Sequence, residues 1–250
     1  LYVMKAIIQG GKEFNELLVL GSLSCIFWTL TLQTTTKYVI IALRADNKGE
    51  GGILSLFALT RSKAGWAAIL TMIGASALLV DGVLTPAITV TSSIEGLRML
   101  NPNFPVVIFV LFIIAILFFI QQFGSTKVGS SFGPIMVIWF LMLGIIGFSN
   151  LITNPGILKA VNPEYAYMFL KEYPGAFLLL GAVFLATTGA EALYTDLGHC
   201  GRGNIQVAWL LVKGALLLNY FGQGAWLLKG GNHAAGENPF FGIMPSWFLI

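Results

Sequence analysis

Two acidic residues inside long apolar segments are the side chains best placed to do chemistry in this chain. Asp81 lies near the middle of the apolar segment Gly65–Leu97, and Glu191 lies late in the segment Gly175–Thr195. In a helix that crosses a bilayer, a central carboxylate costs about 2.5–3.5 kcal/mol on insertion scales, so it needs a partner or a function. Asp81 and Glu191 are therefore candidate binding residues.

Hydroxyl-bearing residues follow Asp81 at the spacing of a helical face. At 100° per residue, Thr85 and Thr89 lie at about +40° and +80° from Asp81. Ser92 and Glu95 continue the same stripe at about +20° and −40°. The sequence thus predicts a helix that carries oxygen ligands along one side and apolar side chains elsewhere.

Glu191 lies in a polar, glycine-containing stretch, TTGAEA, at residues 187–192. Thr188 shares a helical face with Glu191 at the i, i+3 spacing, and Gly189 weakens the helix between them. A glycine-interrupted helix at membrane depth is tolerated where it lines a cavity or is buried in protein. Broken helices of this kind commonly hold the ion site of a transporter.

The candidate ligands are all oxygen atoms, and the chain offers no lysine or arginine in the middle of an apolar segment. Oxygen ligands suit hard cations, and hydroxyl and carbonyl oxygens can replace the hydration shell of a monovalent ion. A purely structural role is the alternative, because membrane threonines often bond their own helix and a buried acid can bond a neighbouring helix. The combination on two helices favours a cation site.

Other polar residues in apolar segments are assigned to helix packing. Asn219 and Gln223 lie one turn apart, and such amides commonly hold transmembrane helices together. Gln33 and Thr34–Thr36 receive the same interpretation.

The composition identifies the class of protein. Hydrophobic residues make up 56% of the 250 residues and charged residues 10%, compared with about 25% charged in ordinary soluble domains. A soluble enzyme, a nucleic-acid binder and a disordered chain are excluded, because so much apolar surface could not be hidden from water. The net charge of +3, two cysteines and two histidines indicate no polyanionic partner, disulfide framework or metal cage.

The apolar pattern predicts an all-α polytopic membrane protein built as a helical bundle. Segments of about 20 apolar residues favour spanning helices over the short alternating strands of a barrel. We expect a single, partial transmembrane domain over residues 1–250, because the last segment stops soon after it begins. The predicted spans cover residues 17–43, 65–97, 104–123, 134–152, 175–195 and 207–228, with the start of another at 245–250.

Basic residues give a weak orientation signal. The loop Arg44–Lys63 holds four of them, Arg44, Lys48, Arg61 and Lys63, more than any other loop. Since cytoplasmic loops carry an excess of Lys and Arg, this loop is predicted to lie in the cytoplasm.

Several long strings resemble the KUP/HAK/KT family of potassium uptake permeases, in the same order from end to end. The strings RADNKGEGG and TGAEALYTDLGH are idiosyncratic enough to make chance similarity negligible. The resemblance is carried by KYVIIALRADNKGEGGILSLFAL (Lys37–Leu59), DGVLTPAITVTSSIEGL (Asp81–Leu97), FGPIMVIWF (Phe132–Phe140), GAVFLATTGAEALYTDLGH (Gly181–His199), NYFGQGAWLL (Asn219–Leu228) and NPFF (Asn238–Phe241).

The resemblance implies a potassium site made of five residues of this sequence. An acid in the family's third helix with a threonine one turn later matches Asp81 and Thr85, and the hydroxyl of the next turn is Thr89. A threonine and a glutamate in the sixth helix match Thr188 and Glu191. Asp81 and Glu191 are also the candidate proton-coupling acids.

The resemblance also implies the wider architecture and setting. It implies part of a LeuT-type inverted-repeat fold of the APC superfamily, covering the second to seventh helices and the start of the eighth. The family's GDIGTSPLY motif, with a further aspartate, would fall just before Leu1-Tyr2. The expected activity is secondary active potassium uptake by proton symport across the bacterial cytoplasmic (inner) membrane. Potassium ion and proton are the expected substrates, with no cofactor and no nucleic acid, and a homodimer is left open.

Other function classes stay open at this point. A channel-like potassium subunit would conduct without stoichiometric coupling. An amino-acid permease of the same superfamily would share the fold, since fold alone does not fix the substrate. The two carboxylates argue against that permease. An enzyme is not expected, because the chain contains no nucleophile–base pair.

Overall fold

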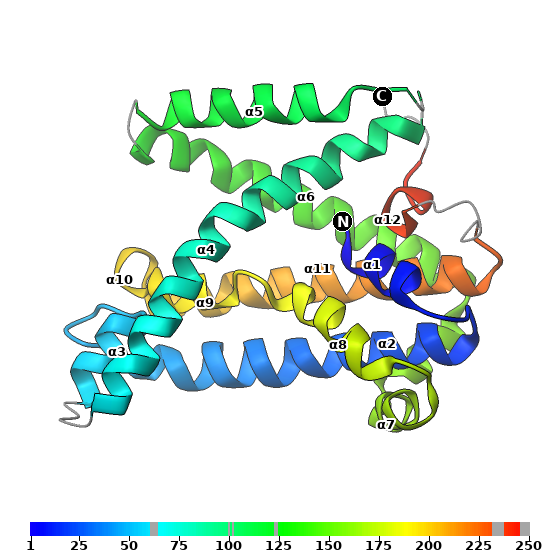
Figure 1. Ribbon diagram of the computed structural model, residues 1–250, viewed down its shortest axis with the longest axis horizontal. Helices are drawn as coiled ribbons and strands as arrows, with labels where there is room; N and C mark the ends of the chain where they lie inside the picture. Colours follow the sequence, from blue (N-terminus) through cyan, green and yellow to red (C-terminus); the bar gives the residue numbers. More distant parts are fainter. Residues whose placement is uncertain (61–64, 100, 102, 123–124, 232–237, 246–250) are drawn as a thin grey trace.

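The helical class predicted from the composition is confirmed by the computed structural model (Figure 1), which describes residues 1–60, 65–99, 101, 103–122, 125–231 and 238–245. In this part of the chain, the regular structure is helical apart from one isolated β-bridge between Asn47 and Glu50. Helical segments long and apolar enough to cross a membrane lie at Glu16–Arg44, Gly65–Arg98, Phe132–Thr153, Ala176–Thr195 and Arg202–Leu228, with a shorter apolar helix at Val106–Ile120.

Each of the six predicted spans contains helical residues, and some spans contain more than one helical element. The 3-10 segments are η2 to η5, and η1 is a π-helix. The elements are α1 (Val3–Gly10), α2 (Glu16–Thr29), η1 (Leu30–Ile41), η2 (Ala42–Arg44), α3 (Ile53–Thr60), α4 (Gly65–Glu95), η3 (Gly96–Met99), α5 (Val106–Gln121), α6 (Ser125–Thr153), η4 (Pro155–Val161), α7 (Pro163–Glu172), α8 (Ala176–Phe184), η5 (Leu185–Thr187), α9 (Ala190–Thr195), α10 (Leu197–Cys200), α11 (Arg202–Leu228) and α12 (Pro239–Gly242).

Two sequence predictions fall on residues that are not described. The start of a further span at 245–250 lies almost entirely outside the described residues, which end at 245. Arg61 and Lys63, two of the four basic residues of the predicted cytoplasmic loop, also lie outside them.

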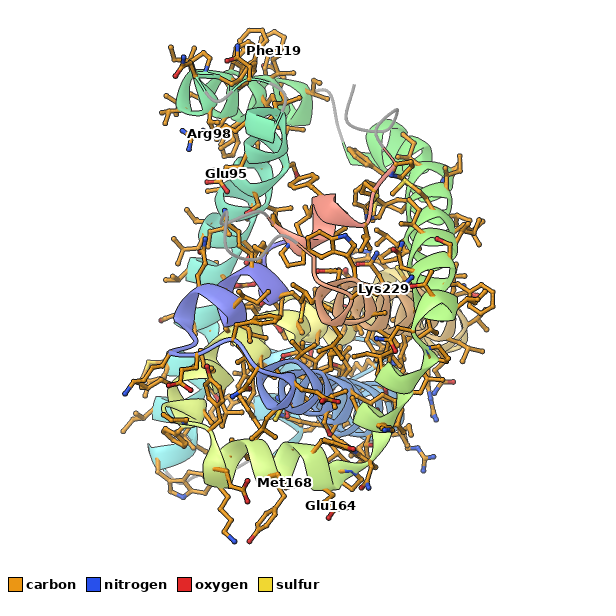
Figure 2. All side chains as sticks on the ribbon, turned by 90° about the vertical axis from the view of Figure 1, so that its right-hand side faces the viewer. Glu95, Arg98, Phe119, Glu164, Met168 and Lys229 are labelled. Atoms are coloured by element: carbon orange, nitrogen blue, oxygen red, sulfur yellow. The ribbon has the colours of Figure 1, made fainter. Side chains whose placement is uncertain are left out.

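The core of the molecule lies around α2 and α11, which run side by side along the long axis (Figure 1). Helix α2 begins after Asn15, whose side-chain oxygen accepts a hydrogen bond from the Leu18 backbone N–H at 2.7 Å, as an N-cap does. Its apolar side chains are buried against α7, where Phe169 is fully buried. In the perpendicular view, Glu164 and Met168 mark α7 at one end of the molecule and Phe119 marks α5 at the other (Figure 2).

Helices α6 and α11 pack closely against each other. A Cβ atom on Gly147 would lie 2.4 Å from the backbone carbonyl of Leu218, so the two backbones approach as only glycine allows. The buried Asn219 side chain donates to the Leu143 carbonyl of α6 at 3.4 Å and accepts from Gln223 at 2.7 Å. The packing role is confirmed for Asn219, which bonds a second helix, whereas the bond of Gln223 is to Asn219 on the same helix.

Helix α4 crosses the other helices diagonally and keeps an apolar outer face (Figure 1). Leu79 and Val83 are 76% and 73% exposed. Such apolar side chains are suited to contact lipid or other apolar helices. The polar stripe predicted on this helix lies on its less exposed face, and Ser92 is buried. Near the end of α4, Glu95 (Figure 2) forms a 2.8 Å ion pair with Lys5 of α1.

The second half of the first predicted span differs from a simple α-helix. Residues Leu30–Ile41 form a π-helix, in which the Thr35 and Thr36 hydroxyls donate to the carbonyls of Leu30 and Thr31, five residues earlier. Composition alone does not distinguish α from π winding, so this change could not be predicted from the residues. Long π-helices are rare, and short π segments are frequent at functional sites.

Candidate cation site

Asp81 and Thr85 form the most direct contact among the five predicted site residues. The Thr85 hydroxyl donates to the Asp81 carboxylate at 2.7 Å, and both side chains are partly buried on α4. The one-turn spacing placed the two groups on one face, because residues four apart are neighbours on a helix. With its donor hydrogen directed at Asp81, Thr85 keeps lone pairs that can face a cation.

Tyr2, immediately before α1, links the α4 acid to the interrupted helix. Its phenol interacts with the Thr188 side chain and lies within the electrostatic field of Asp81. Three segments far apart in sequence thus bring a carboxylate, a phenol and a hydroxyl together. Tyr2 was not predicted as a site residue, because no local sequence pattern places it near an acidic residue of a membrane-spanning helix.

The helix that carries Thr188 and Glu191 is interrupted, as its sequence predicted. Helix α8 ends at Phe184, a 3-10 turn covers Leu185–Thr187, and α9 begins only at Ala190. Thr188 is extended at ψ 131° and Gly189 has φ +84°, a left-handed conformation that favours glycine. The break turns Thr188 away from the regular helix and brings its side chain to Tyr2.

Glu191 lies in the first turn of α9 and faces a different tyrosine. Its carboxylate acts electrostatically on Tyr38 of the π-helix η1, which packs against α9. The two acids therefore act electrostatically on different phenols, Asp81 on Tyr2 and Glu191 on Tyr38.

A cavity of about 490 Å³ adjoins the Asp81 side of the site. Tyr2, Thr89, Ser93, Asn219 and Tyr220 are the polar residues of its lining. The rest of its wall comes from Leu1 and from apolar residues of α6, α11 and α12: Ile135, Met136, Trp139, Phe140, Leu143, Leu216 and Phe240. Because an apolar cavity has a low local dielectric constant, the electrostatic interactions of its few polar groups are stronger than in water.

The donor set is poor in the ligands that hold transition metals. Within the part of the chain that the structure describes, no three His, Cys, Asp or Glu side chains gather into a metal-binding group. The groups around Tyr2 are one carboxylate, hydroxyls and a phenol. Oxygen ligands of low total charge suit a monovalent cation that is bound and released.

Comparison with known proteins decides the family. The family model described as the K+ potassium transporter integral membrane domain matches residues 1–250. The chain belongs to this potassium transporter family. The resemblance inferred from the sequence strings is thereby confirmed, and the chain is an integral membrane segment of a transporter rather than an enzyme.

Curated relatives agree with this assignment. A probable potassium transport system protein Kup from Cytophaga hutchinsonii is 58% identical over 255 residues, covering 100% of this chain and 39% of the relative. A protein of the same name from Flavobacterium psychrophilum is 54% identical, and the match covers 99% of this chain and 39% of that protein. Another from Clostridium perfringens is also 54% identical, and the match covers 100% of this chain and 41% of that protein. The chain thus spans about two fifths of these relatives' length. No solved structure matches it.

Proposed function

We propose that this chain forms the ion-binding part of a secondary active potassium uptake system. The observation that carries the proposal is the group Asp81, Thr85, Tyr2 and Thr188, which joins the polar stripe of α4 to the interrupted helix. Family membership and the potassium transport names of the relatives support potassium as the ion. A partly buried carboxylate surrounded by neutral oxygens is the arrangement that a desolvated monovalent cation requires.

The proposed potassium site comprises Asp81, Thr85, Thr89, Thr188 and Glu191, and we add Tyr2 on the basis of its contacts. Thr89 contributes through the 490 Å³ cavity that it shares with Tyr2. The interrupted backbone around Gly189 supports a site at this depth, because broken helices hold coupling ions in transporters.

The proposal includes proton symport, in which potassium uptake is coupled to proton movement. Glu191 acts on the Tyr38 phenol whereas Asp81 acts on the Tyr2 phenol, so we assign proton exchange to Glu191 and the cation position to Asp81. A cation near either acid favours its ionised form, whereas a second nearby carboxylate favours protonation. Potassium entry would therefore be linked to proton movement at these carboxylates.

The interrupted α8–α9 helix also supports the proposed LeuT-type inverted-repeat architecture, in which discontinuous helices meet at the substrate site. The membrane is proposed to be the bacterial cytoplasmic (inner) membrane, because the relatives named above are bacterial.

Potassium uptake by the full-length gene product tests this function. Expressed in a strain that lacks its own potassium uptake systems, it should accumulate potassium or rubidium above the gradient that the membrane potential alone supports. A protonophore should collapse that accumulation. Uptake that only equilibrates with the membrane potential would indicate a channel-like subunit and would contradict the proposal.

A further inference from the structure

A second cavity of about 270 Å³ is lined in part by Thr188. The backbone interruption lines it at Ala186–Ala190, and the π-helix η1 lines it at Leu30 and Thr34. Its remaining walls are largely apolar and come from α6, α9 and α11: Phe140, Leu193, Ala208, Trp209, Val212 and Leu216.

Thr34 is the unusual residue of this cavity. Its side chain is 1% exposed, and its Oγ1 is buried without a hydrogen-bond partner among the residues that the structure describes. The neighbouring Thr35 and Thr36 behave differently, since each donates to a carbonyl of its own helix. The packing role predicted for Thr34–Thr36 thus fits the last two and leaves the Thr34 hydroxyl unused.

A buried hydroxyl without a partner is costly, because it has lost its hydrogen bonds to water. Native structures satisfy nearly all such groups, and an unsatisfied one marks a place where a ligand or water binds. Thr34 lines a cavity that Thr187 and Thr188 also line, and the Thr187 hydroxyl, which donates to the Phe184 carbonyl, keeps lone pairs that can accept. The site is therefore built from hydroxyl oxygens, within walls that offer no charged competitor.

The two cavities share part of their lining. Tyr2 lines the first cavity and Thr188 lines the second, and Phe140 and Leu216 contribute to both. An ion that leaves the Asp81 group past Thr188 would therefore enter the cavity of Thr34.

We propose that the Thr34 cavity is a second binding station for a partly hydrated monovalent cation, a proposal that rests on the potassium uptake proposed above. Thr34, Thr187 and Thr188 supply oxygen ligands on one side, and water remains on the ion toward the apolar walls. Since a water molecule takes about 30 Å³ of liquid, a cavity of about 270 Å³ has room for a cation with several waters. Two adjacent stations allow binding that is strong enough to admit the ion and weak enough to release it.

Equilibrium binding of radioactive rubidium to the full-length gene product in lipid nanodiscs tests the second station. At saturation the wild type should bind about two ions per chain, one for each oxygen-lined group. Thr34→Val keeps the shape of the side chain but removes the hydroxyl, so it should bind one. Thr36→Val is the matched control, because that hydroxyl is already bonded to the Thr31 carbonyl of the same π-helix, and it should bind two.

Uptake kinetics supply a second readout. Thr34→Val should lower the maximal rate of rubidium uptake about tenfold, the size expected for one lost bond to a charged group, with little change in KM. Thr34→Ser should restore most of the rate because it returns the hydroxyl.

The outcomes separate the two proposals. Absence of rubidium binding and uptake in the wild type contradicts the potassium function itself. Normal uptake with a single bound ion in the wild type, or two bound ions in Thr34→Val, contradicts only the second station. If Thr34→Val does not fold, anomalous scattering from wild-type crystals in rubidium decides, because a peak beside Thr34 Oγ1 supports the station and its absence contradicts it.

Discussion

Gly189→Ala is predicted to weaken transport through backbone strain alone. Gly189 has φ +84° and ψ 0°, and a Cβ atom added there would meet nothing within 4 Å. Steric overlap with neighbours therefore contributes nothing to the effect. What remains is the left-handed conformation, which costs an L-residue about 1–2 kcal/mol.

The strain acts directly on the proposed site. The chain can relieve it by rewinding the interruption between α8 and α9, which would withdraw Thr188 from Tyr2. A penalty of about 1–2 kcal/mol lowers the population of the interrupted conformation about 5- to 30-fold when the two conformations are close in energy. The initial rate of rubidium uptake should fall by up to that factor.

Gly181→Ala is the matched control for this prediction. Gly181 lies inside α8 on an exposed face, it lacks a positive φ, and its Cβ would also meet nothing within 4 Å. Alanine is favoured over glycine in a helix by about 1 kcal/mol, so this variant should keep the wild-type uptake rate with equal or higher thermal stability. Both variants are measured at matched membrane expression. Wild-type uptake by Gly189→Ala would refute the assignment of the interruption to the site.

Three further predictions concern helix packing, coupling and the 45–50 loop. Gly147→Ala should destabilise the protein by about 1–3 kcal/mol in detergent unfolding, because its Cβ would lie 2.4 Å from a carbonyl of α11. Gly144→Ala is the control and should have little effect, because the nearest contacts of its Cβ are at 3.7 Å. Equal stability of the two variants would contradict the packing account. Glu191→Gln should leave a lower potassium uptake rate that no longer varies with external pH between about 5 and 8, because glutamine cannot exchange a proton. The exposed Asp196→Asn should keep the pH dependence, and an unchanged pH profile in Glu191→Gln would remove the coupling role. Tyr194→Phe should lower the free energy of unfolding by about 1 kcal/mol, because it removes the 2.5 Å hydrogen bond from the Tyr194 hydroxyl to the Ala45 carbonyl. An unchanged melting temperature would show that this hydrogen bond does not hold the loop.

Local periodicity was enough to predict the polar face of α4. Asp81 and Thr85 are four residues apart, and in a helix that spacing brings their side chains together wherever the helix lies. The same holds for the interruption near Gly189, because glycine beside polar residues in a membrane helix is a local feature of the sequence. The contact at 2.7 Å and the φ of +84° are the structural counterparts of these two patterns.

Features that depend on tertiary packing could not be predicted in this way. Tyr2 approaches Thr188 and Asp81 across most of the chain, and no pattern around residue 2 indicates that contact. The polar residues of Leu30–Ile41 do not distinguish π from α winding, so the unpaired hydroxyl of Thr34 became visible only with the backbone in place.

Asp81→Asn tests the central claim most directly. The substitution keeps the size of the side chain and lowers the cost of membrane insertion, so the variant should reach the membrane and retain its unfolding temperature. It removes the negative charge around which Thr85 and Tyr2 are arranged. Rubidium uptake and binding by the full-length gene product should then be lost, measured against the wild type at equal expression. A well-expressed Asp81→Asn variant that takes up rubidium at the wild-type rate and affinity would contradict the proposed cation site.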